Sequence, residues 1–135
     1  MAEEYLADHF PAAPVMPGVM MLQTLVEASA WLVRASEDFA HSVVVLKEAR
    51  SVKYASFVEP GSTLKITAEA TGQDERYTKI KAQATVDEAV AVSARLVMER
   101  FNLEESDPRQ REVDQYVTAR LREMFGLLNR QVAAV

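Results

Sequence analysis

A helix-forming segment that is apolar on most of its faces, residues 17–35, precedes four segments with the character of β-strands. In the helical segment apolar residues recur at spacings of three and four, and further apolar residues fill the positions between them. A surface helix carries a single apolar stripe, so this pattern predicts a buried central helix. The strand-like segments span residues 43–56, 62–71, 77–86 and 89–101, and they are β-branched or alternate between apolar and polar residues.

The order of these segments indicates an α+β fold in which an antiparallel sheet wraps around the central helix. Turn residues separate the strands, as at Pro60-Gly61 and at Asp87-Glu88. One face of the last three strands is expected to face the core; it comprises Leu64, Ile66, Ala68, Ala70, Ile80, Ala82, Ala84, Val86, Val90, Val92, Ala94, Leu96 and Met98. The many alanines among them suit a helix that packs closely on a curved sheet.

A second helix is predicted near the C-terminus, after an acidic linker over residues 102–107. Asp107 and Pro108 provide a helix N-cap and a proline at the first helical position. The apolar residues that follow recur at spacings of three and four, as in an amphipathic helix: Val113, Tyr116, Val117, Leu121, Met124, Phe125 and Leu128. We expect this helix to cover an exposed edge or groove, and contact with a second subunit or an external partner is the alternative.

Length and composition set limits on the class of protein. A chain of 135 residues suffices for one domain with a core. Its net charge of −5 gives no reason to expect nucleic-acid binding, and the absence of cysteine excludes disulfides and thiol chemistry. No apolar run approaches the ~18 residues of a membrane span. The start of the sequence lacks a basic segment followed by an apolar one, so we expect a cytoplasmic protein.

Residues suited to catalysis are concentrated just before the central helix. Pro11, Pro14 and Pro17 each fix a backbone φ angle, which makes a stiff loop. His9 at the start of this loop titrates near neutral pH and can act as a general base. Gly18 follows the last proline, where the first N–H groups of the helix have no partner within it. Its N–H is a candidate donor to a carbonyl oxygen that gains negative charge.

The residues His9-Phe10-Pro11, followed by Pro14-Val15-Met16-Pro17-Gly18-Val19, resemble the signature of the 3-hydroxyacyl-acyl-carrier-protein dehydratases of the FabZ/FabA type. Phe57-Val58-Glu59-Pro60-Gly61 is similar to the strand and turn that this family has after its central helix. The resemblance covers roughly residues 6–101. It implies a hotdog fold, with a hotdog domain over residues 1–101 and a linker and C-terminal helix over residues 102–135.

The resemblance also implies a function and a site. A dehydratase of this type acts on 3-hydroxyacyl or 2-enoyl thioesters of acyl carrier protein in fatty-acid synthesis, with the histidine and a carboxylate contributed by different chains of a dimer. By resemblance, His9 and the Gly18 N–H are catalytic. The substrate-binding residues implied in the same way are Phe10, Pro17, Val19, Met20 and Phe57. No metal and no cofactor are expected, and the partners are a thioester on acyl carrier protein or coenzyme A and a second subunit.

Two departures from the family pattern bear on activity. Gln23 occupies the position of the family's catalytic carboxylate, and an amide does not transfer protons near neutral pH. Glu27 stands one turn later, where the family often has glutamine. Residues four apart share a helix face, about 6 Å apart along the axis, so Glu27 is the candidate substitute acid. Strand-forming sequence of the kind that the family carries upstream of its histidine is not found in residues 1–8, so we expect either that this chain starts late or that its sheet is one strand smaller.

These departures leave alternatives to an active dehydratase open. The chain is alternatively a catalytically degenerate acyl-binding protein, or one subunit of a hetero-oligomeric dehydratase that contributes His9 to a paralogue's carboxylate. A hotdog acyl thioesterase, with Glu27 activating water, is a second alternative. The other histidine, His41, belongs to no such grouping and is expected at the surface.

Overall fold

The computed structural model describes residues 18–55 and 63–133. In chain order it contains α2 (Gly18–Ser36), β1 (Val43–Tyr54), β2 (Lys65–Gln73), β3 (Tyr77–Val86) and β4 (Ala89–Phe101), then the 3-10 turns η1 (Leu103–Glu105) and η2 (Pro108–Gln110), and finally α3 (Arg111–Ala133). The predicted helices and strands are all present, with ends within a few residues of those expected. The expected loss of a strand upstream of His9 lies outside the described residues.

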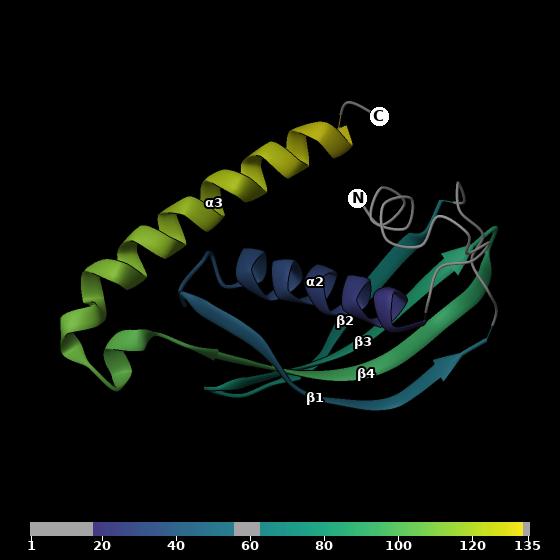
Figure 1. Ribbon diagram of the computed structural model, residues 1–135, viewed down its shortest axis with the longest axis horizontal. Coiled ribbons are helices and arrows are strands. Elements are labelled where there is room, and N and C mark those ends of the chain that lie inside the picture. The colour runs from purple at the N-terminus through teal and green to yellow at the C-terminus, as the bar shows by residue number, and fades with distance from the viewer. Residues whose placement is uncertain (1–17, 56–62, 134–135) are drawn as a thin grey trace.

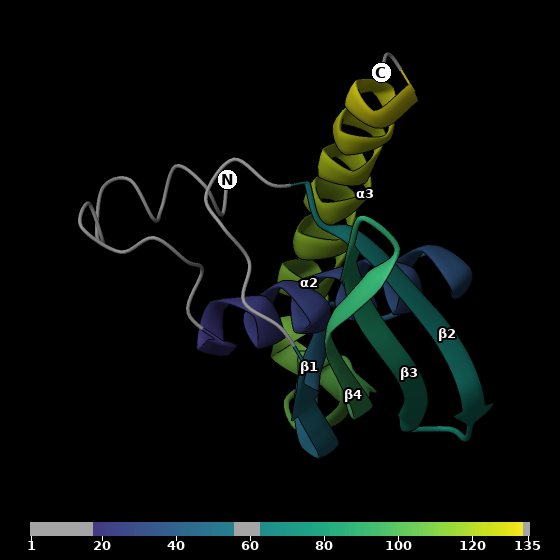
Figure 2. The ribbon, with the colours of Figure 1, turned by 90° about the vertical axis from the view of Figure 1, so that its right-hand side faces the viewer.

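The four strands form one antiparallel sheet in the order β1-β4-β3-β2, so β1 and β2 are its edges in the described part of the chain. The sheet is twisted and curves around α2, which lies across its inner face (Figure 1). Figure 2, turned by 90°, shows the four strands fanned out around α2. This arrangement of a central helix held by a curved antiparallel sheet is the α+β plan that the sequence predicts.

The core lies between α2 and the inner face of the sheet. Its helix side is a stripe of residues four apart, namely Met21, Leu25, Ser29 and Val33, each at most 3% exposed. Ala82, Ala84 and Ala94 line the opposing strands and are nearly inaccessible to solvent. Because alanine extends only a methyl group from the sheet, the helix can approach closely, as the sequence indicates.

Two predicted core positions are exposed, and a β-bulge explains one of them. Val90 is 37% exposed, because the ladder between β3 and β4 shifts register after Ala84 and places Ala91 beside Val92 in the core. A bulge inserts an extra residue, which reverses the alternation of faces beyond it. Ala70 lies opposite the buried Ile80 and so keeps its predicted face, but it is exposed on the edge strand β2.

The C-terminal region begins as predicted but packs differently from expectation. The Asp107 side chain accepts a hydrogen bond from the Arg109 N–H, and Pro108 begins the turn η2 that leads into α3. The Phe125 ring of α3 lies 5.9 Å from that of Trp31 and 5.8 Å from that of Phe39, between centroids. The packing of α3 is against η1, η2 and this aromatic cluster, and the expected cover of a sheet edge is not among its contacts.

A buried carboxylate fixes the base of α3. Asp114 is 5% exposed and accepts hydrogen bonds from the Ser42 hydroxyl and, at 2.9 Å each, from the backbone N–H groups of Leu103 and Glu104. Burial by itself raises the pKa of the Asp114 carboxyl, but these three donors favour its charged form and the net effect lowers the pKa. The carboxylate thus joins α3 to the turn after β4 and to the residue before β1.

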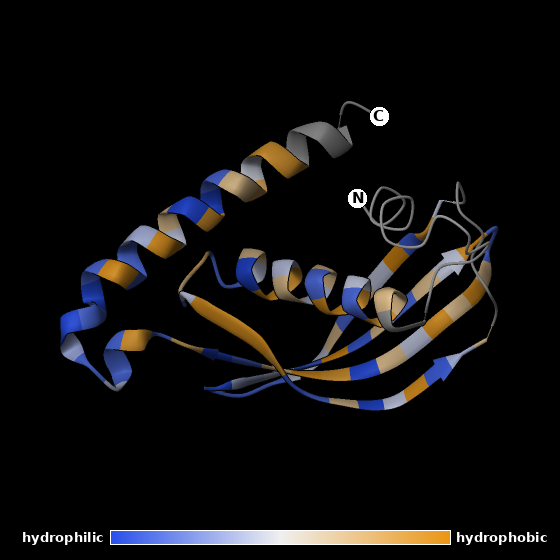
Figure 3. Ribbon diagram, viewed as in Figure 1, coloured by the Kyte–Doolittle hydropathy of each residue, from blue (hydrophilic) through white to orange (hydrophobic). Residues whose placement is uncertain are grey.

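The apolar residues of α3 lie on one broad face of the helix, as its amphipathic pattern predicts, but only part of that face is covered. Val117, Leu121, Phe125 and Leu128 are half-buried against the body of the molecule, whereas Val113, Tyr116, Met124 and Leu127 are exposed. Figure 3 shows apolar residues at intervals along the whole visible length of α3. None of the described helices combines the length and apolar character that crossing a membrane requires.

Candidate functional site

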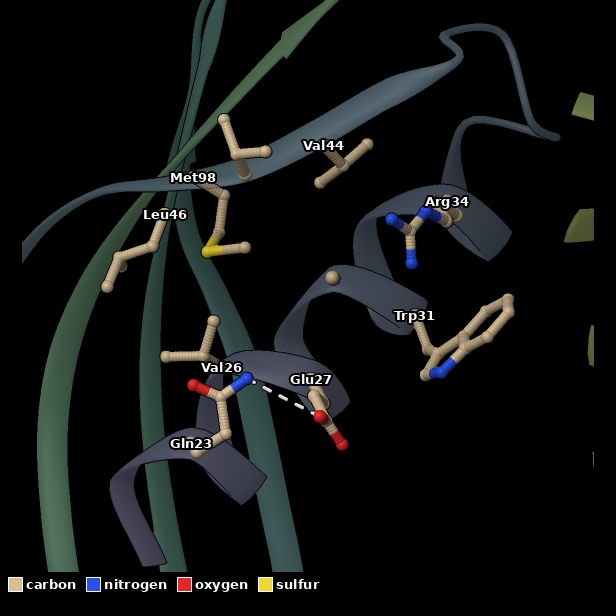
Figure 4. Close-up of a pocket in the computed structure, with 10 residues that line it drawn as sticks. Gln23, Val26, Glu27, Trp31, Arg34, Val44, Leu46 and Met98 are labelled. Atoms are coloured by element: carbon tan, nitrogen blue, oxygen red, sulfur yellow. Dashed lines mark hydrogen bonds between the residues drawn. The ribbon is translucent and has the colours of Figure 1, made fainter. Parts of the chain in front are cut away.

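A groove of about 260 Å³ runs between α2 and the edge strand β1. Figure 4 shows its residues. Its floor and far wall are apolar and comprise Val26, Ala30, Val44, Val45, Leu46 and Met98. Gln23 and Glu27 of α2 provide polar groups along its near side, and Trp31 and Arg34 lie further along the helix. The groove therefore combines an apolar surface with a small number of polar groups, as ligand sites commonly do.

Gln23 and Glu27 occupy the same face of α2, as their spacing of four residues predicts. The Gln23 Nε2 donates a long hydrogen bond of 3.4 Å to the Glu27 Oε1, and both side chains are exposed. One amide donor and one carboxylate are thereby presented side by side at the edge of an apolar groove (Figure 4). The carboxylate can exchange a proton, whereas the amide can only donate or accept a hydrogen bond.

The far end of the groove carries a positive charge. The Arg34 guanidinium lies over the Trp31 ring, 5.0 Å from its centroid. Burial lowers the pKa of Arg34, and the nearby Glu37 carboxylate acts in the opposite direction. Arginine stays charged at any physiological pH. The groove thus has a carboxylate near one end of its lining and a cation near the other.

The other residues predicted for the site are only partly placed. His9, Phe10, Pro17 and Phe57 lie outside the described residues, so their convergence with α2 stays a prediction. Gly18 is the first residue of α2, which agrees with its expected place at a helix N-terminus. Val19 lies in the first turn of α2, and its side chain is outside the described part of the structure. Met20 is half-buried and packs against the core rather than lining the groove.

His41 belongs to a charged cluster, and the expectation that it lies alone at the surface is wrong. Its Nδ1 is 3.1 Å from the Glu37 Oε2, and the imidazole is 24% exposed. The same carboxylate oxygen lies 3.4 Å from the Arg100 Nη1, whose side chain is 5% exposed. Arg100 also donates to the backbone carbonyl of Asp74. The cluster ties the end of α2 to β4 and to the turn between β2 and β3. It therefore has a structural explanation outside the groove.

Nothing in the described part of the chain forms a metal site, because no three histidine, cysteine, aspartate or glutamate residues are grouped there. The polar side chains that line the groove are those of Gln23, Glu27, Trp31 and Arg34. These are groups for hydrogen bonding and proton transfer.

Sequence comparison relates this chain to dehydratases. The family model described as ApeI-like, ApeI dehydratase, matches residues 2–94. The 3-hydroxyacyl-[acyl-carrier-protein] dehydratase FabZ of Lactobacillus helveticus is 35% identical over 94 residues, which cover 70% of this chain and 64% of the relative. The corresponding FabZ of Levilactobacillus brevis is 36% identical with the same coverage. The chain thus spans a little under two thirds of the length of these relatives.

Comparison with solved structures supports the fold. One chain of the dehydratase heterocomplex ApeI:P from Xenorhabdus doucetiae aligns with a TM-score of 0.58 and 22% identity, covering 72% of this chain and 67% of that one. A thioesterase complexed with coenzyme A and Zn from Thermus thermophilus aligns with a TM-score of 0.55 and 12% identity, covering 69% and 73%. At such identities the likeness establishes the hotdog fold alone, while the family match over residues 2–94 shows that the chain belongs to the ApeI-like dehydratases.

Proposed function

We propose that this protein is a dehydratase that interconverts 3-hydroxyacyl and 2-enoyl thioesters, carried on acyl carrier protein or coenzyme A. The observation that carries the proposal is the groove between α2 and β1, in which the Glu27 carboxylate stands beside an apolar wall. A thioester substrate has an apolar acyl chain and a reacting centre that exchanges protons. The groove offers an apolar surface for the acyl chain and a carboxyl group for the proton exchange, and the chain belongs to a dehydratase family.

In the proposed mechanism one proton leaves C2 of the substrate and the hydroxyl leaves C3 as water. His9 accepts the C2 proton, and the Gly18 N–H stabilises the charge that develops on the thioester oxygen. Glu27, in its protonated form, supplies the proton that the departing hydroxyl needs. The cycle closes when His9 releases its proton to solvent and Glu27 takes up a proton from solvent. The Gln23 amide, hydrogen-bonded to Glu27 at 3.4 Å, orients the carboxylate and donates to the substrate.

The size and position of the groove favour an assembly of two chains. Pockets for small molecules usually enclose about 300–1,000 Å³ and bury most of the ligand. The groove in one protomer has about 260 Å³ and lies beside an edge strand on which Val45 and Leu46 are 44% and 38% exposed. A second chain seated at β1 would cover these side chains and supply the missing wall. We propose a homodimer or a pair with a paralogue as the functional unit.

The test is an assay of 2-enoyl thioester hydration, with thioester hydrolysis measured in parallel, on the coenzyme A and acyl-carrier-protein forms of one substrate. We expect wild-type hydration, and a loss of about 10²–10⁴-fold in Glu27→Gln, which is typical when a general acid is removed. His9→Ala should show a loss of similar size. Glu88→Gln, which changes an exposed carboxylate in the turn between β3 and β4, is the matched control and should retain full activity.

The remaining outcomes separate the alternative functions. A wild type that is inert in hydration, but becomes active as Gln23→Glu or when mixed with a paralogue, identifies a partner subunit with a degenerate site. The ApeI:P dehydratase of Xenorhabdus doucetiae is itself a heterocomplex. Hydrolysis of the thioester that depends on Glu27 identifies a thioesterase. Hydration that is unaffected by both His9→Ala and Glu27→Gln contradicts the proposed mechanism.

A further inference from the structure

The C-terminal helix α3 carries a row of apolar side chains that are exposed in the described part of the chain. Val113, Tyr116, Met124 and Leu127, which we call the outer stripe, are 43%, 67%, 46% and 54% exposed. They recur along about four turns of the helix, at spacings that keep them on one face. The apolar residues that contact the body of the molecule, Val117, Leu121, Phe125 and Leu128, lie directly beside the outer stripe on the helix surface. The outer stripe itself has no partner among the described residues, and Figure 3 shows the apolar residues at intervals along α3.

The helix also stands clear of the sheet. Its base is fixed by Asp114 and the turns η1 and η2, and its middle by the rings of Trp31 and Phe39 around Phe125. Beyond these contacts α3 projects away from the sheet, and Figure 1 shows its length along one side of the molecule. Residues 95–133, which include the whole of α3, fall outside the region that the family model matches. The groove between α2 and β1 does not include any residue of the outer stripe.

The outer stripe is symmetric about its central residue. Tyr116 and Met124 each lie four residues from Arg120, on opposite sides of it. Val113 and Leu127 each lie seven residues from the same centre. When two identical helices cross antiparallel with Arg120 at the two-fold axis, each Tyr116 therefore meets Met124 of the other copy, and each Val113 meets Leu127. Self-complementarity of this kind is the requirement for an isologous contact.

The charges on the same face fit this arrangement. Within one chain, the Arg120 Nη1 lies 3.2 Å from the Glu123 Oε2. Around a two-fold axis at Arg120, the Glu123 of each helix is displaced from the Arg120 of the other copy by about one helical turn or less, within reach of an arginine side chain. The two arginines and two glutamates thus alternate in sign around the axis. Each Arg120 lies near the Glu123 of its own chain and near the Glu123 of the other copy.

We propose that the outer stripe of α3 binds the outer stripe of a second copy of this chain, antiparallel, with Arg120 at the two-fold axis. Specific interfaces bury upwards of about 1,000 Å² in total, and a contact between two helices of this length lies near that lower end. The association is therefore concentration-dependent. It is independent of the pairing proposed at β1, so it joins two monomers if β1 is unpaired and two dimers if β1 is paired.

The test is sedimentation velocity of the full chain over a range of concentrations, with two single variants and their combination. Tyr116→Lys and Met124→Glu each place a charge against an apolar residue of the other copy, and each should raise the dissociation constant of this step about tenfold or more. In the double variant each lysine faces a glutamate of the other copy, so association should recover to within about threefold of wild type. Gln115→Lys, an exposed substitution on the opposite face of α3, is the matched control and should associate as wild type does.

A second measurement tests the axis itself. The chain contains no cysteine, so Arg120→Cys introduces a single thiol. Under mild oxidation this variant should form a disulfide-linked dimer, while Ala119→Cys, one position round the helix, should not. Circular dichroism of each variant verifies that α3 remains folded.

Three results overturn the proposal. One is a wild type whose mass is the same as that of Tyr116→Lys at every concentration. The second is a double variant that associates no better than the singles, since only the antiparallel register pairs position 116 with position 124. The third is binding of the wild type to phosphatidylcholine vesicles that both single variants and the double variant lose, which assigns the outer stripe to a lipid surface.

Discussion

Ser29 places a hydroxyl in the most deeply buried stripe of α2. The residue is fully inaccessible to solvent, and its Oγ has no hydrogen-bond partner in the described part of the chain. A buried hydroxyl without a partner costs on the order of 1–3 kcal/mol relative to one in water. The neighbours in the stripe, Leu25 and Val33, are apolar, so the environment suits a methyl group better than a hydroxyl.

Replacing this side chain with a methyl group should stabilise the protein. Ser29→Ala is expected to raise the free energy of unfolding by about 1 kcal/mol, because it removes the unpaired hydroxyl and adds helix propensity. Urea titration followed by circular dichroism measures the change. Ser36→Ala, at the exposed end of the same helix, should stay within about 0.5 kcal/mol of wild type. A loss of stability in Ser29→Ala would show that the hydroxyl is paired after all.

At the scale of single residues, sequence reasoning succeeds where partners are local. The spacing of Gln23 and Glu27 predicts that they share a helix face, and their hydrogen bond confirms it; their chemical roles stay predictions. The contact between Glu37 and Arg100 joins residues 63 positions apart. No periodicity in the sequence reports such a pair. The partner of His41 is Glu37, only four residues away, but His41 follows the end of α2 and lies outside any helical pattern that would have indicated this contact.

At the scale of elements, α3 depends on a single carboxylate at its base. The Asp114 oxygens accept from the backbone N–H groups of Leu103 and Glu104, which would otherwise lack partners where the chain turns from β4. Asp114→Asn keeps the size of the side chain but loses its charge. It also replaces one accepting oxygen by an NH₂ group, which would face the N–H and O–H donors that Asp114 now binds. We expect a loss of about 2 kcal/mol in unfolding free energy at pH 7, the usual scale for hydrogen bonds to a charged group.

The pH dependence of this loss follows from the direction of the pKa shift. The folded protein holds the pKa of Asp114 below its ordinary value, so the stabilisation is complete above the unfolded pKa of about 3.9. It disappears as pH falls from about 4 through the lower folded pKa, where the carboxylate becomes protonated. The difference in stability between wild type and Asp114→Asn should therefore be constant from about pH 5 to 7 and shrink below pH 4, as measured by urea titrations across that range. A difference independent of pH would contradict this role.

The elements themselves could be predicted because helices and strands repeat locally, and the N-cap at Asp107 is identifiable for the same reason. The bulge that exposes Val90 could not, since it arises from the pairing of two strands. The exposure of half of the apolar face of α3 is also hidden in the sequence, because the spacing of apolar residues does not report which part of a broad face is covered.

At the scale of the whole molecule, β1 is an unpaired edge in the described structure. Its outer hydrogen-bonding groups and the exposed side chains of Val45 and Leu46 lie beside the groove. Edges of this kind pair readily with another strand unless charge or covering prevents it. Because β1 is apolar where it borders the groove, we expect the second chain to pair with it there.

A charge on this edge should block the assembly and reduce activity together. Leu46→Lys is expected to halve the mass of the smallest stable assembly and to lower hydration by at least about tenfold, because a lysine on an edge strand opposes pairing. Light scattering after gel filtration gives the mass. Thr71→Lys, an exposed substitution on the other edge strand, is the control. A variant that loses activity while keeping its mass would assign Leu46 to ligand contact alone.

The alanines beneath α2 have a consequence for selectivity. Ala82, Ala84 and Ala94 determine how near the helix axis lies to the sheet, and the same helix forms one wall of the groove beside β1. A larger residue at any of them would move α2 away from the sheet and widen the groove, although none of the residues that line the groove would change. The width of the groove can therefore be changed by substitutions beneath α2, at positions that do not line the groove themselves.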